Sequence, residues 1–219
     1  MTTAALSLEH LLKPSSLKEG KIPVLFMFHG YGSNEEDLFS FASDLPPEFC
    51  IISVRAPLTL PTFGYAWYTI NFDAAFGKWS DEDEARWARE KIVHFIEEAC
   101  TAYYLDKNNV TLLGFSQGTI LSYAVALSYP EKIRNVIALS GYINESILVE
   151  DYAQKDHSKV QIYASHGSVD QVIPVEWAQN APALLEALKI PFTYEEFPVG
   201  HGVSPQNFVA FKKWLKNRI

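Results

Sequence analysis

The chain alternates between short apolar runs and longer segments with helical periodicity, and this alternation limits the folds open to it. Six apolar runs are typical of buried strands and lie at residues 23–28, 49–54, 110–115, 135–139, 160–164 and 192–197. Five helix-like segments lie at residues 35–42, 82–104, 117–128, 175–188 and 205–216. Continuous apolar strands that alternate with helices predict an α/β fold, a mostly parallel central sheet with helices on both faces.

The segment 82–104 has the clearest helical pattern. Its apolar residues recur at spacings of three or four, as Ala85, Ala88, Ile92, Phe95, Ala99 and Tyr103. Ser80 is expected to cap its N-terminus. Residues 6–12 alternate weakly and predict an antiparallel edge strand. Since no linker, repeat or low-complexity tract interrupts the pattern, we expect a single domain over residues 1–219.

The charge of the chain restricts its partners. Its formal net charge of -8 disfavours nucleic acid and steady attachment to anionic lipid, because both carry negative charge. No apolar run approaches the roughly 18 residues of a membrane span, and the N-terminus lacks the pattern of a signal peptide. We therefore expect a cytoplasmic protein, a monomer or homodimer, that acts on a small molecule of neutral or weak charge.

Cysteine and histidine spacing gives no sign of a metal. Cys50 and Cys100 are expected to be buried, reduced thiols, with a disulfide as the alternative. The sequence contains no Cys-x-x-Cys motif and no closely spaced histidine pair, so no metal site is predicted.

The residues Gly114-Phe115-Ser116-Gln117-Gly118 lie where an apolar strand gives way to a helix. Glycine inside either element costs about 0.5–1 kcal/mol relative to alanine, so the pair indicates a sharply bent backbone. The pattern Gly-x-Ser-x-Gly in this context predicts a nucleophile elbow that presents the Ser116 hydroxyl. An ordinary strand-to-helix turn is the alternative.

An activated serine needs a base, and six histidines compete for that role. We expect His201, because it follows the last strand, precedes the last helix and has a glycine on each side. His166 also follows a strand and is the alternative. His29 precedes a glycine-rich turn that suggests another role. The three remaining histidines follow no strand end at the active edge and are expected on the surface or against the core: His10, His94 and His157.

The third residue should be a carboxylate placed between the serine and the histidine in the chain. Asp170 follows the strand 160–164 by a short glycine-containing loop and is the expected acid, with a helix-capping role as its alternative. The other acidic residues before that strand are expected in a solvated loop: Glu145, Glu150, Asp151 and Asp156.

Attack on a carbonyl also requires donors for the negative oxygen. One donor is expected to be the N–H of Gln117, directly after the nucleophile. The other is expected to be the N–H of Tyr31, in a loop of residues 29–32 whose glycines free the backbone. A simple tight turn is the alternative for that loop.

The segment 61–80 is expected to select the substrate. It shows no clear secondary structure and holds seven aromatic residues between positions 63 and 79. We expect Phe63, Trp67 and Tyr68 to line an apolar trench beside Ser116, although some of the rings could instead seal the core.

Five motifs in order resemble those of the phospholipase/carboxylesterase family, which includes the acyl-protein thioesterases. They are Phe28-His29-Gly30-Tyr31-Gly32, Ala66-Trp67-Tyr68, Gly114-Phe115-Ser116-Gln117-Gly118, His166-Gly167-Ser168-Val169-Asp170 and Gly200-His201-Gly202-Val203-Ser204-Pro205. The resemblance implies a compact α/β-hydrolase fold without a large cap domain, no cofactor, and cleavage of esters or thioesters through an acyl-enzyme. It also implies Ser116, Asp170 and His201 as the triad, with the Tyr31 and Gln117 amides as oxyanion donors.

The leading hypothesis is a serine carboxylesterase for short to medium acyl groups. Tyr31 and Thr69 depart from the residues usual in the thioesterases, which makes acylated protein the alternative substrate rather than the first. A thioesterase or lysophospholipase is therefore the nearest alternative within enzymes. A non-catalytic binding module on a hydrolase fold is the alternative from another class.

Overall fold

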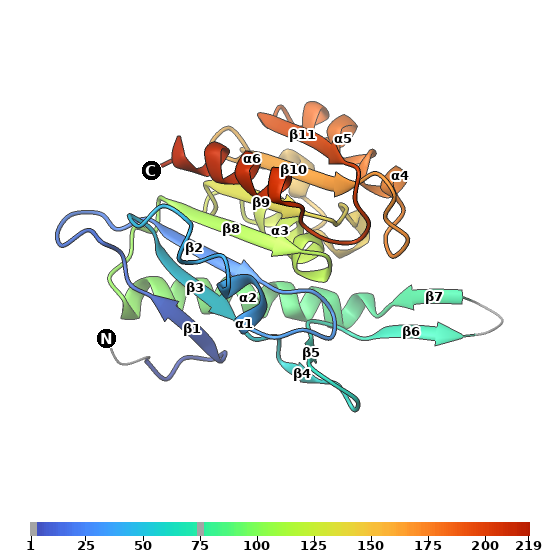
Figure 1. Cartoon of the computed structure of the whole chain (residues 1–219), viewed down its shortest axis with the longest axis horizontal. Helices are drawn as coiled ribbons and strands as arrows, with labels where there is room; N and C mark the ends of the chain where they lie inside the picture. Colours follow the sequence, from blue (N-terminus) through green and yellow to red (C-terminus); the bar gives the residue numbers. More distant parts are fainter. Residues whose placement is uncertain (1–3, 74–76) are drawn as a thin grey trace.

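A seven-stranded sheet forms the centre of the computed structural model, which describes residues 4–73 and 77–219 (Figure 1). Its strand order is β1-β3-β2-β8-β9-β10-β11. The strands are β1 (His10–Lys13), β2 (Val24–Phe28), β3 (Cys50–Val54), β8 (Val110–Phe115), β9 (Asn135–Leu139), β10 (Gln161–Gly167) and β11 (Phe192–Phe197). Strand β1 is antiparallel to β3 and all other neighbours are parallel. The mostly parallel sheet and its antiparallel N-terminal edge are therefore confirmed.

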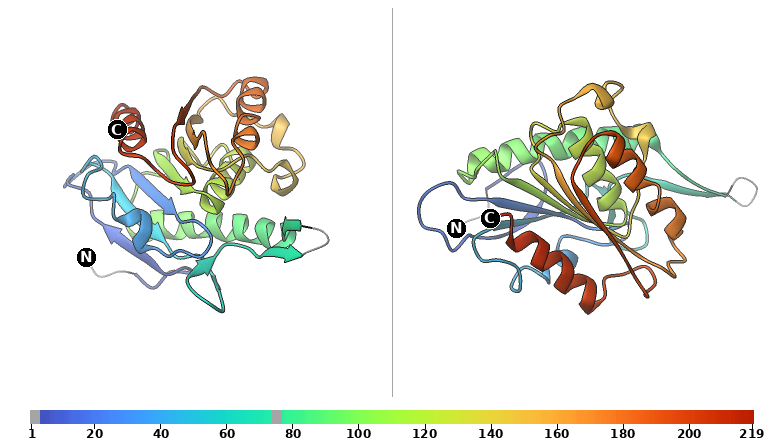
Figure 2. Two further views of the ribbon diagram at one scale, coloured as in Figure 1. Left: turned by 45° about the vertical axis from the view of Figure 1, so that its right-hand side comes forward. Right: turned by 90° about the horizontal axis from the view of Figure 1, so that it is seen from above.

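Helices cover both faces of this sheet, as predicted (Figure 2). The helices are α1 (Glu36–Phe39), α2 (Glu82–Ala102), α3 (Gln117–Ser128), α4 (Val175–Ala178), α5 (Ala181–Ala187) and α6 (Pro205–Lys216), with the short 3-10 turns η1 (Glu145–Ile147) and η2 (Tyr152–Gln154). Buried residues of α2, α3 and α5 pack on one face of the sheet, and those of α1 and α6 pack on the other. Alternate residues of each buried strand join the two cores, which is why these strands read as continuous apolar runs.

Several boundaries differ from the sequence expectation. Strand β10 continues to Gly167, three residues past the predicted end, so His166 lies within the strand and does not follow it. The edge strand β1 begins at His10, and α2 ends at Ala102. The predicted helix 175–188 is two helices, because Pro182 lies in the first turn of α5 and cannot continue a helix from α4. The predicted helix 35–42 contains only α1. Asp81, not Ser80, caps α2, since its carboxylate accepts the Glu84 amide at 2.9 Å.

The segment 61–80 contains regular structure, so the expectation of none is wrong. Two antiparallel hairpins run through it, β4 (Leu58–Thr59) with β5 (Tyr65–Ala66) and β6 (Ile70–Asp73) with β7 (Gly77–Ser80). The β6–β7 hairpin extends beyond the sheet (Figure 1). These strands are short and neither turn carries an Asn-Gly or Asp-Gly pair, so the sequence gives little hairpin signal. Phe76, one of the expected aromatics, lies outside the described residues.

The carboxyl ends of the central strands lie level with one another. Phe28 is opposite Gly114, and Phe115 is opposite Leu139. The loops that follow β2, β8 and β9 therefore begin at the same edge of the sheet, where ligands of parallel sheets bind. Cys50 and Cys100 are buried and free, as expected. Within the described ranges, no helix combines the length and the apolar character that a bilayer crossing requires.

Candidate active site

Ser116 lies in a strained turn between β8 and α3. Its backbone has φ 54° and ψ -117°, and its N–H donates to the Leu139 carbonyl at 2.9 Å. A Cβ at Gly118 would lie 2.0 Å from the Phe28 carbonyl oxygen, and one at Gly114 would lie 2.5 Å from the Gly118 oxygen. Both positions require glycine, because the backbone atoms they meet cannot move aside. The sharp bend predicted from the two glycines is confirmed, and residues 114–118 are hereafter called the elbow.

A chain of hydrogen bonds leads from the elbow to a buried acid. The Ser116 Oγ lies 2.9 Å from the His201 Nε2, and the His201 Nδ1 lies 2.7 Å from the Asp170 Oδ2. The Phe115 ring packs against the His201 imidazole, with 5.0 Å between ring centroids. The structure thus brings together three expected side chains that are separated by up to 85 positions in the sequence. In this order a histidine can take the serine proton while the carboxylate stabilises the resulting imidazolium.

Asp170 is held as a charged acceptor. Its Oδ1 accepts the Val172 and Ile173 amides at 2.8 and 3.0 Å, and its Oδ2 faces His201. Burial alone would raise the pKa of Asp170, but the hydrogen bonds from His201, Ile173 and Val172 together outweigh it and lower the pKa below its ordinary value. Helix α4 begins after Pro174 without a side-chain cap, so the capping role for Asp170 is not supported.

His166 lies beside the same carboxylate. Its Nε2–H donates to the Ile173 carbonyl at 2.9 Å, and the same nitrogen is 3.3 Å from the Asp170 Oδ2. The side chain is fully buried. His166 therefore braces the loop that carries Asp170, whereas the contact with Ser116 is made by His201. The remaining histidines are placed as expected, with His10 and His157 bonded to backbone carbonyls and His94 exposed.

The loop after β2, residues 29–33, approaches Ser116 from the neighbouring strand and is hereafter called the β2 loop. The buried His29 ring fixes its start, since Nδ1–H donates to the Gly30 carbonyl at 2.8 Å and Nε2 accepts the Ala56 amide at 3.0 Å. Burial lowers the pKa of His29, so the ring is neutral, in agreement with its role as an acceptor. Gly32 has φ +78°, a conformation that favours glycine.

The two residues whose amides are the expected oxyanion donors both line the same cavity as Ser116. They are Tyr31 in the β2 loop and Gln117, the first residue of α3. Neither backbone N–H donates a hydrogen bond within the described ranges of the chain. Gly30 brings the β2 loop close to the nucleophile, because a Cβ there would lie 3.2 Å from the Ser116 Cβ. Free amides at a helix N-terminus are suited to an anionic oxygen.

The Gln117 side chain makes a connection that sequence reasoning missed. Its Oε1 accepts the Trp67 amide at 2.8 Å, and its Nε2 donates to the Tyr68 carbonyl at 2.8 Å. The Trp67 indole N–H in turn donates to the His29 carbonyl at 3.0 Å. The elbow, the β2 loop and the segment 65–68 are thereby joined by buried hydrogen bonds.

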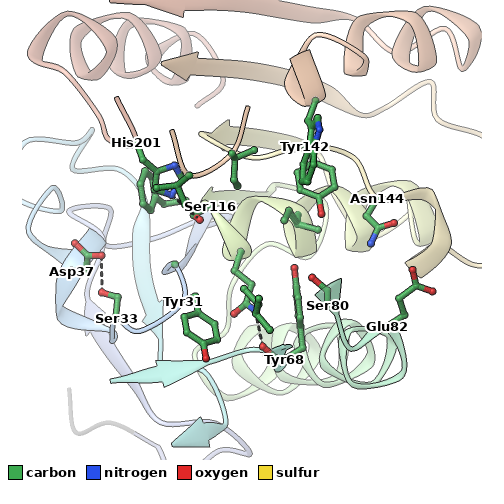
Figure 3. A pocket seen from close by; sticks show the side chains of 18 residues that line it. Tyr31, Ser33, Asp37, Tyr68, Ser80, Glu82, Ser116, Tyr142, Asn144 and His201 are labelled. Atoms are coloured by element: carbon green, nitrogen blue, oxygen red, sulfur yellow. Dashed lines mark hydrogen bonds between the residues drawn. The ribbon is translucent and has the colours of Figure 1, made fainter. Parts of the chain in front are cut away.

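A cavity of about 550 Å³ opens beside Ser116 (Figure 3). Its walls include Tyr31, Ser33, Asp37, Tyr68, Ile70, Ser80, Glu82, Phe115, Gln117, Ile120, Tyr142, Asn144, Val172, Ile173, Trp177 and His201. This volume is within the range of small-molecule sites.

Of the three residues expected to bind substrate, only Tyr68 lines this cavity. Trp67 is fully buried, because its ring packs between Phe28 and His29 and its indole N–H needs the His29 carbonyl. Phe63 is 73% exposed and lies away from the cavity wall. Trp67 therefore supports the site from behind and does not form its wall.

Several wall residues were missed, although their positions carried a signal. Tyr142 comes three residues after β9, at the carboxyl edge of the sheet. Ile120 lies one helical turn after Ser116, and Trp177 packs edge-on against Tyr142 with ring centroids 5.0 Å apart. Inspection of every strand end would have found Tyr142, while Trp177 depends on where α4 packs.

Comparison with known proteins shows the family of this chain. Residues 15–219 match the family model described as Phospholipase/Carboxylesterase. The chain belongs to this family. Its fold is the α/β-hydrolase fold, as the resemblance implied. A carboxylesterase from Bacillus cereus superposes with a TM-score of 0.82 at 19% identity, over 97% of this chain and 95% of that one, which shows the fold alone.

Two curated relatives of this family member are named for a carboxylesterase and for an acyl-protein thioesterase. A probable carboxylesterase SOBER1-like of Arabidopsis thaliana is 31% identical over 130 residues, 59% of this chain and 50% of that protein. The chain thus spans about half the length of that relative. An acyl-protein thioesterase 1 of Candida albicans is 26% identical over 93% of this chain and 95% of that protein.

Proposed function

We propose that this chain is a serine carboxylesterase that hydrolyses esters of short to medium acyl groups through an acyl-enzyme. The observation that carries the proposal is the hydrogen-bonded series Ser116, His201 and Asp170 beside a cavity that Tyr31 and Gln117 also line. Its family membership supports the same reaction class.

The proposed reaction follows the order of these contacts. The His201 Nε2 takes the Ser116 hydroxyl proton while Oγ attacks the ester carbonyl carbon. The negative oxygen that forms is held by the Tyr31 and Gln117 amides, and loss of one such donor typically costs about 3 kcal/mol of transition-state stabilisation. The imidazolium then protonates the departing alcohol, leaving the acyl group on Oγ. Water, deprotonated by His201, releases the acid and restores the serine.

A fluorophosphonate probe combined with p-nitrophenyl esters tests this proposal. The wild type should be labelled on Ser116 and should hydrolyse the esters, because only an activated serine reacts quickly. Ser116→Ala, His201→Ala and the double variant should lose similar amounts of kcat, since the two side chains act in one proton transfer. A binding module would show neither labelling nor turnover. Retention of most activity by Ser116→Ala would refute the assignment.

A thioesterase is the second candidate, favoured by the nearly full-length relative named acyl-protein thioesterase. The same triad can cleave an ester or a thioester, so the two candidate functions differ in the leaving group that the site prefers. Matched ester and thioester substrates with one acyl group separate the candidates. A kcat/KM for the thioester that exceeds the ester value by more than the ratio of their uncatalysed rates would favour the thioesterase.

A further inference from the structure

The side chains that line the cavity lie on two sides of Ser116, and each side includes a carboxylate. Figure 3 shows Ser33 and Asp37 on one side of Ser116, with Tyr68, Ser80, Tyr142, Asn144 and Glu82 on the other. We call the first side the Asp37 arm and the second the Glu82 arm. Tyr31 lies between them in this view.

The Glu82 arm is suited to an acyl chain. Ile70 pairs with Ser80 across the β6–β7 hairpin, and Trp177 packs on Tyr142, so apolar side chains flank the labelled residues. Methylene groups gain from such walls. The Asp37 arm is polar, with the Ser33 hydroxyl donating to the Asp37 carboxylate at 2.7 Å, and it is suited to the alcohol part of an ester.

Carboxylates are the only fixed charges on the part of the cavity wall that the structure describes. No lysine or arginine is among the described residues that line the cavity. Arg86 lies 3.6 Å from the Glu82 carboxylate but does not line the cavity, and its closer contact is with Asp83 at 2.9 Å. Both partners of the Arg86–Glu82 pair are well exposed, so water weakens that pairing and leaves part of the Glu82 charge uncompensated.

The Glu82 charge reaches the interior of the arm. Burial raises the pKa of the Tyr142 phenol, and the Glu82 carboxylate raises it further. Asp37 is exposed at the end of its own arm. A substrate anion in either arm would lie near a like charge, and none of the described side chains that line the cavity belongs to a lysine or arginine that could pair with it.

We propose that the two arms exclude anionic substrates, with Glu82 sensing charge on the acyl group and Asp37 sensing charge on the alcohol. The site then accepts neutral or cationic esters and discriminates against phosphate-bearing alcohols. This inference rests on the proposed esterase function. It concerns which esters are used and leaves the chemical step unchanged.

A charge series on the acyl group tests the first half. The substrates are p-nitrophenyl hexanoate, the p-nitrophenyl monoester of adipic acid and p-nitrophenyl 6-(trimethylammonio)hexanoate, which share one leaving group. We expect kcat/KM for the anionic ester to be about 10- to 100-fold below the neutral one, and the cationic ester to equal or exceed it. Glu82→Gln should reduce the ratio of neutral to anionic kcat/KM several-fold. Added salt should reduce the same ratio in the wild type.

Asp83→Asn is the matched control. This substitution removes one negative charge from the helical turn that also holds Glu82, and Asp83, like Glu82, contacts Arg86. Asp83 does not line the cavity. The substitution should leave the ratio of anionic to neutral kcat/KM within about twofold of the wild-type value. An equal change in both variants would show a general field effect and overturn the role of Glu82.

A charge series on the alcohol tests the second half. Hexanoyl esters of choline, of its neutral isostere 3,3-dimethylbutanol and of the anion isethionate are compared by acid release. Asp37→Asn should reduce the ratio of kcat/KM for the neutral ester to that for the isethionate ester. Glu36→Gln is the control, because Glu36 does not line the cavity. A response of this series to Glu82→Gln instead would overturn the assignment of the arms.

The neutral esters separate the two proposals. Turnover of p-nitrophenyl hexanoate with equal kcat/KM for the anionic ester would overturn the charge inference and leave the esterase function standing. Absence of turnover for all six esters, together with absence of fluorophosphonate labelling, would overturn both.

Discussion

The elbow and the β2 loop approach Ser116 from neighbouring strands and hold their shape by different means. The elbow is fixed by packing, since a Cβ at Gly118 would lie 2.0 Å from the Phe28 carbonyl oxygen. The β2 loop is tied by hydrogen bonds, including those of His29 and a pair in which Gly32 donates to Tyr65 at 2.9 Å. A Cβ at Gly32 would meet nothing within 4 Å. The two loops that carry the proposed oxyanion donors therefore differ in how far their surroundings tolerate substitution.

The largest expected loss of stability comes from a substitution that disrupts the packing of the elbow. Gly118→Ala forces a methyl group into the Phe28 backbone and should destabilise the fold by more than about 3 kcal/mol, with loss of labelling at Ser116. Gly32→Ala is the control, because its cost is the positive φ alone, about 1 kcal/mol. Thermal unfolding of both variants measures the contrast. Equal losses would mean that the elbow has room to relax and that packing does not distinguish the loops.

The next largest effect is expected from loss of the hydrogen bonds between the elbow and the segment 65–68. Gln117→Ala keeps its backbone amide but leaves the Trp67 amide and the Tyr68 carbonyl without their buried partner. We expect a loss of about 2–3 kcal/mol in stability and a moderate fall in kcat. Denaturant unfolding and acetyl-ester kinetics give the two values. An unchanged unfolding midpoint would show that water replaces the side chain at no cost.

Acid should affect the β2 loop through His29. Burial lowers its folded pKa, so below the ordinary value of about 6.5 the unfolded chain binds the proton first and stability falls as the pH falls. This one group contributes a slope of up to about 1.4 kcal/mol per pH unit. His29→Asn should be less stable than the wild type at pH 7.5 and should lose less on going to pH 5.5. Parallel curves of unfolding free energy against pH would contradict this explanation.

The smallest effect concerns the Tyr31 side chain. Tyr31→Phe retains the backbone amide, which is the group proposed to contact the oxyanion, and the side chain is 37% exposed. Acetyl-ester kcat should stay within about threefold of the wild type, because the oxyanion term comes from the backbone. A hundredfold fall with intact folding would assign the role to the hydroxyl instead.

Many of the strands and helices could be predicted, because the sequence patterns that specify them are local. The runs at 110–115, 135–139 and 192–197 match β8, β9 and β11, since each is a short apolar or β-rich run bounded by turn residues. The helices at 117–128 and 205–216 also match, the second with Ser204 as N-cap. The two hairpins and the break at Pro182 were missed, because weak strands and a permitted proline leave little trace in periodicity.

The site divides in the same way. Ser116, Asp170 and His201 each follow a strand in a short segment that contains glycine, so their convergence could be read from the sequence. The cavity wall could not, because Tyr142 and Trp177 meet only through the packing of α4. Trp67 shows the limit of composition as a guide, since aromatic rings are recruited to the interior as readily as to a cavity.

Gln117 belongs to two structures at once. Its backbone amide is a proposed oxyanion donor, while its side chain holds the segment that continues into Tyr68 on the cavity wall. A ligand that displaces Tyr68 therefore pulls on the residue that stabilises the transition state. Substrate binding and the rate of the chemical step are therefore coupled through the Gln117 side chain. A poorly fitting acyl group should lower kcat as well as raise KM.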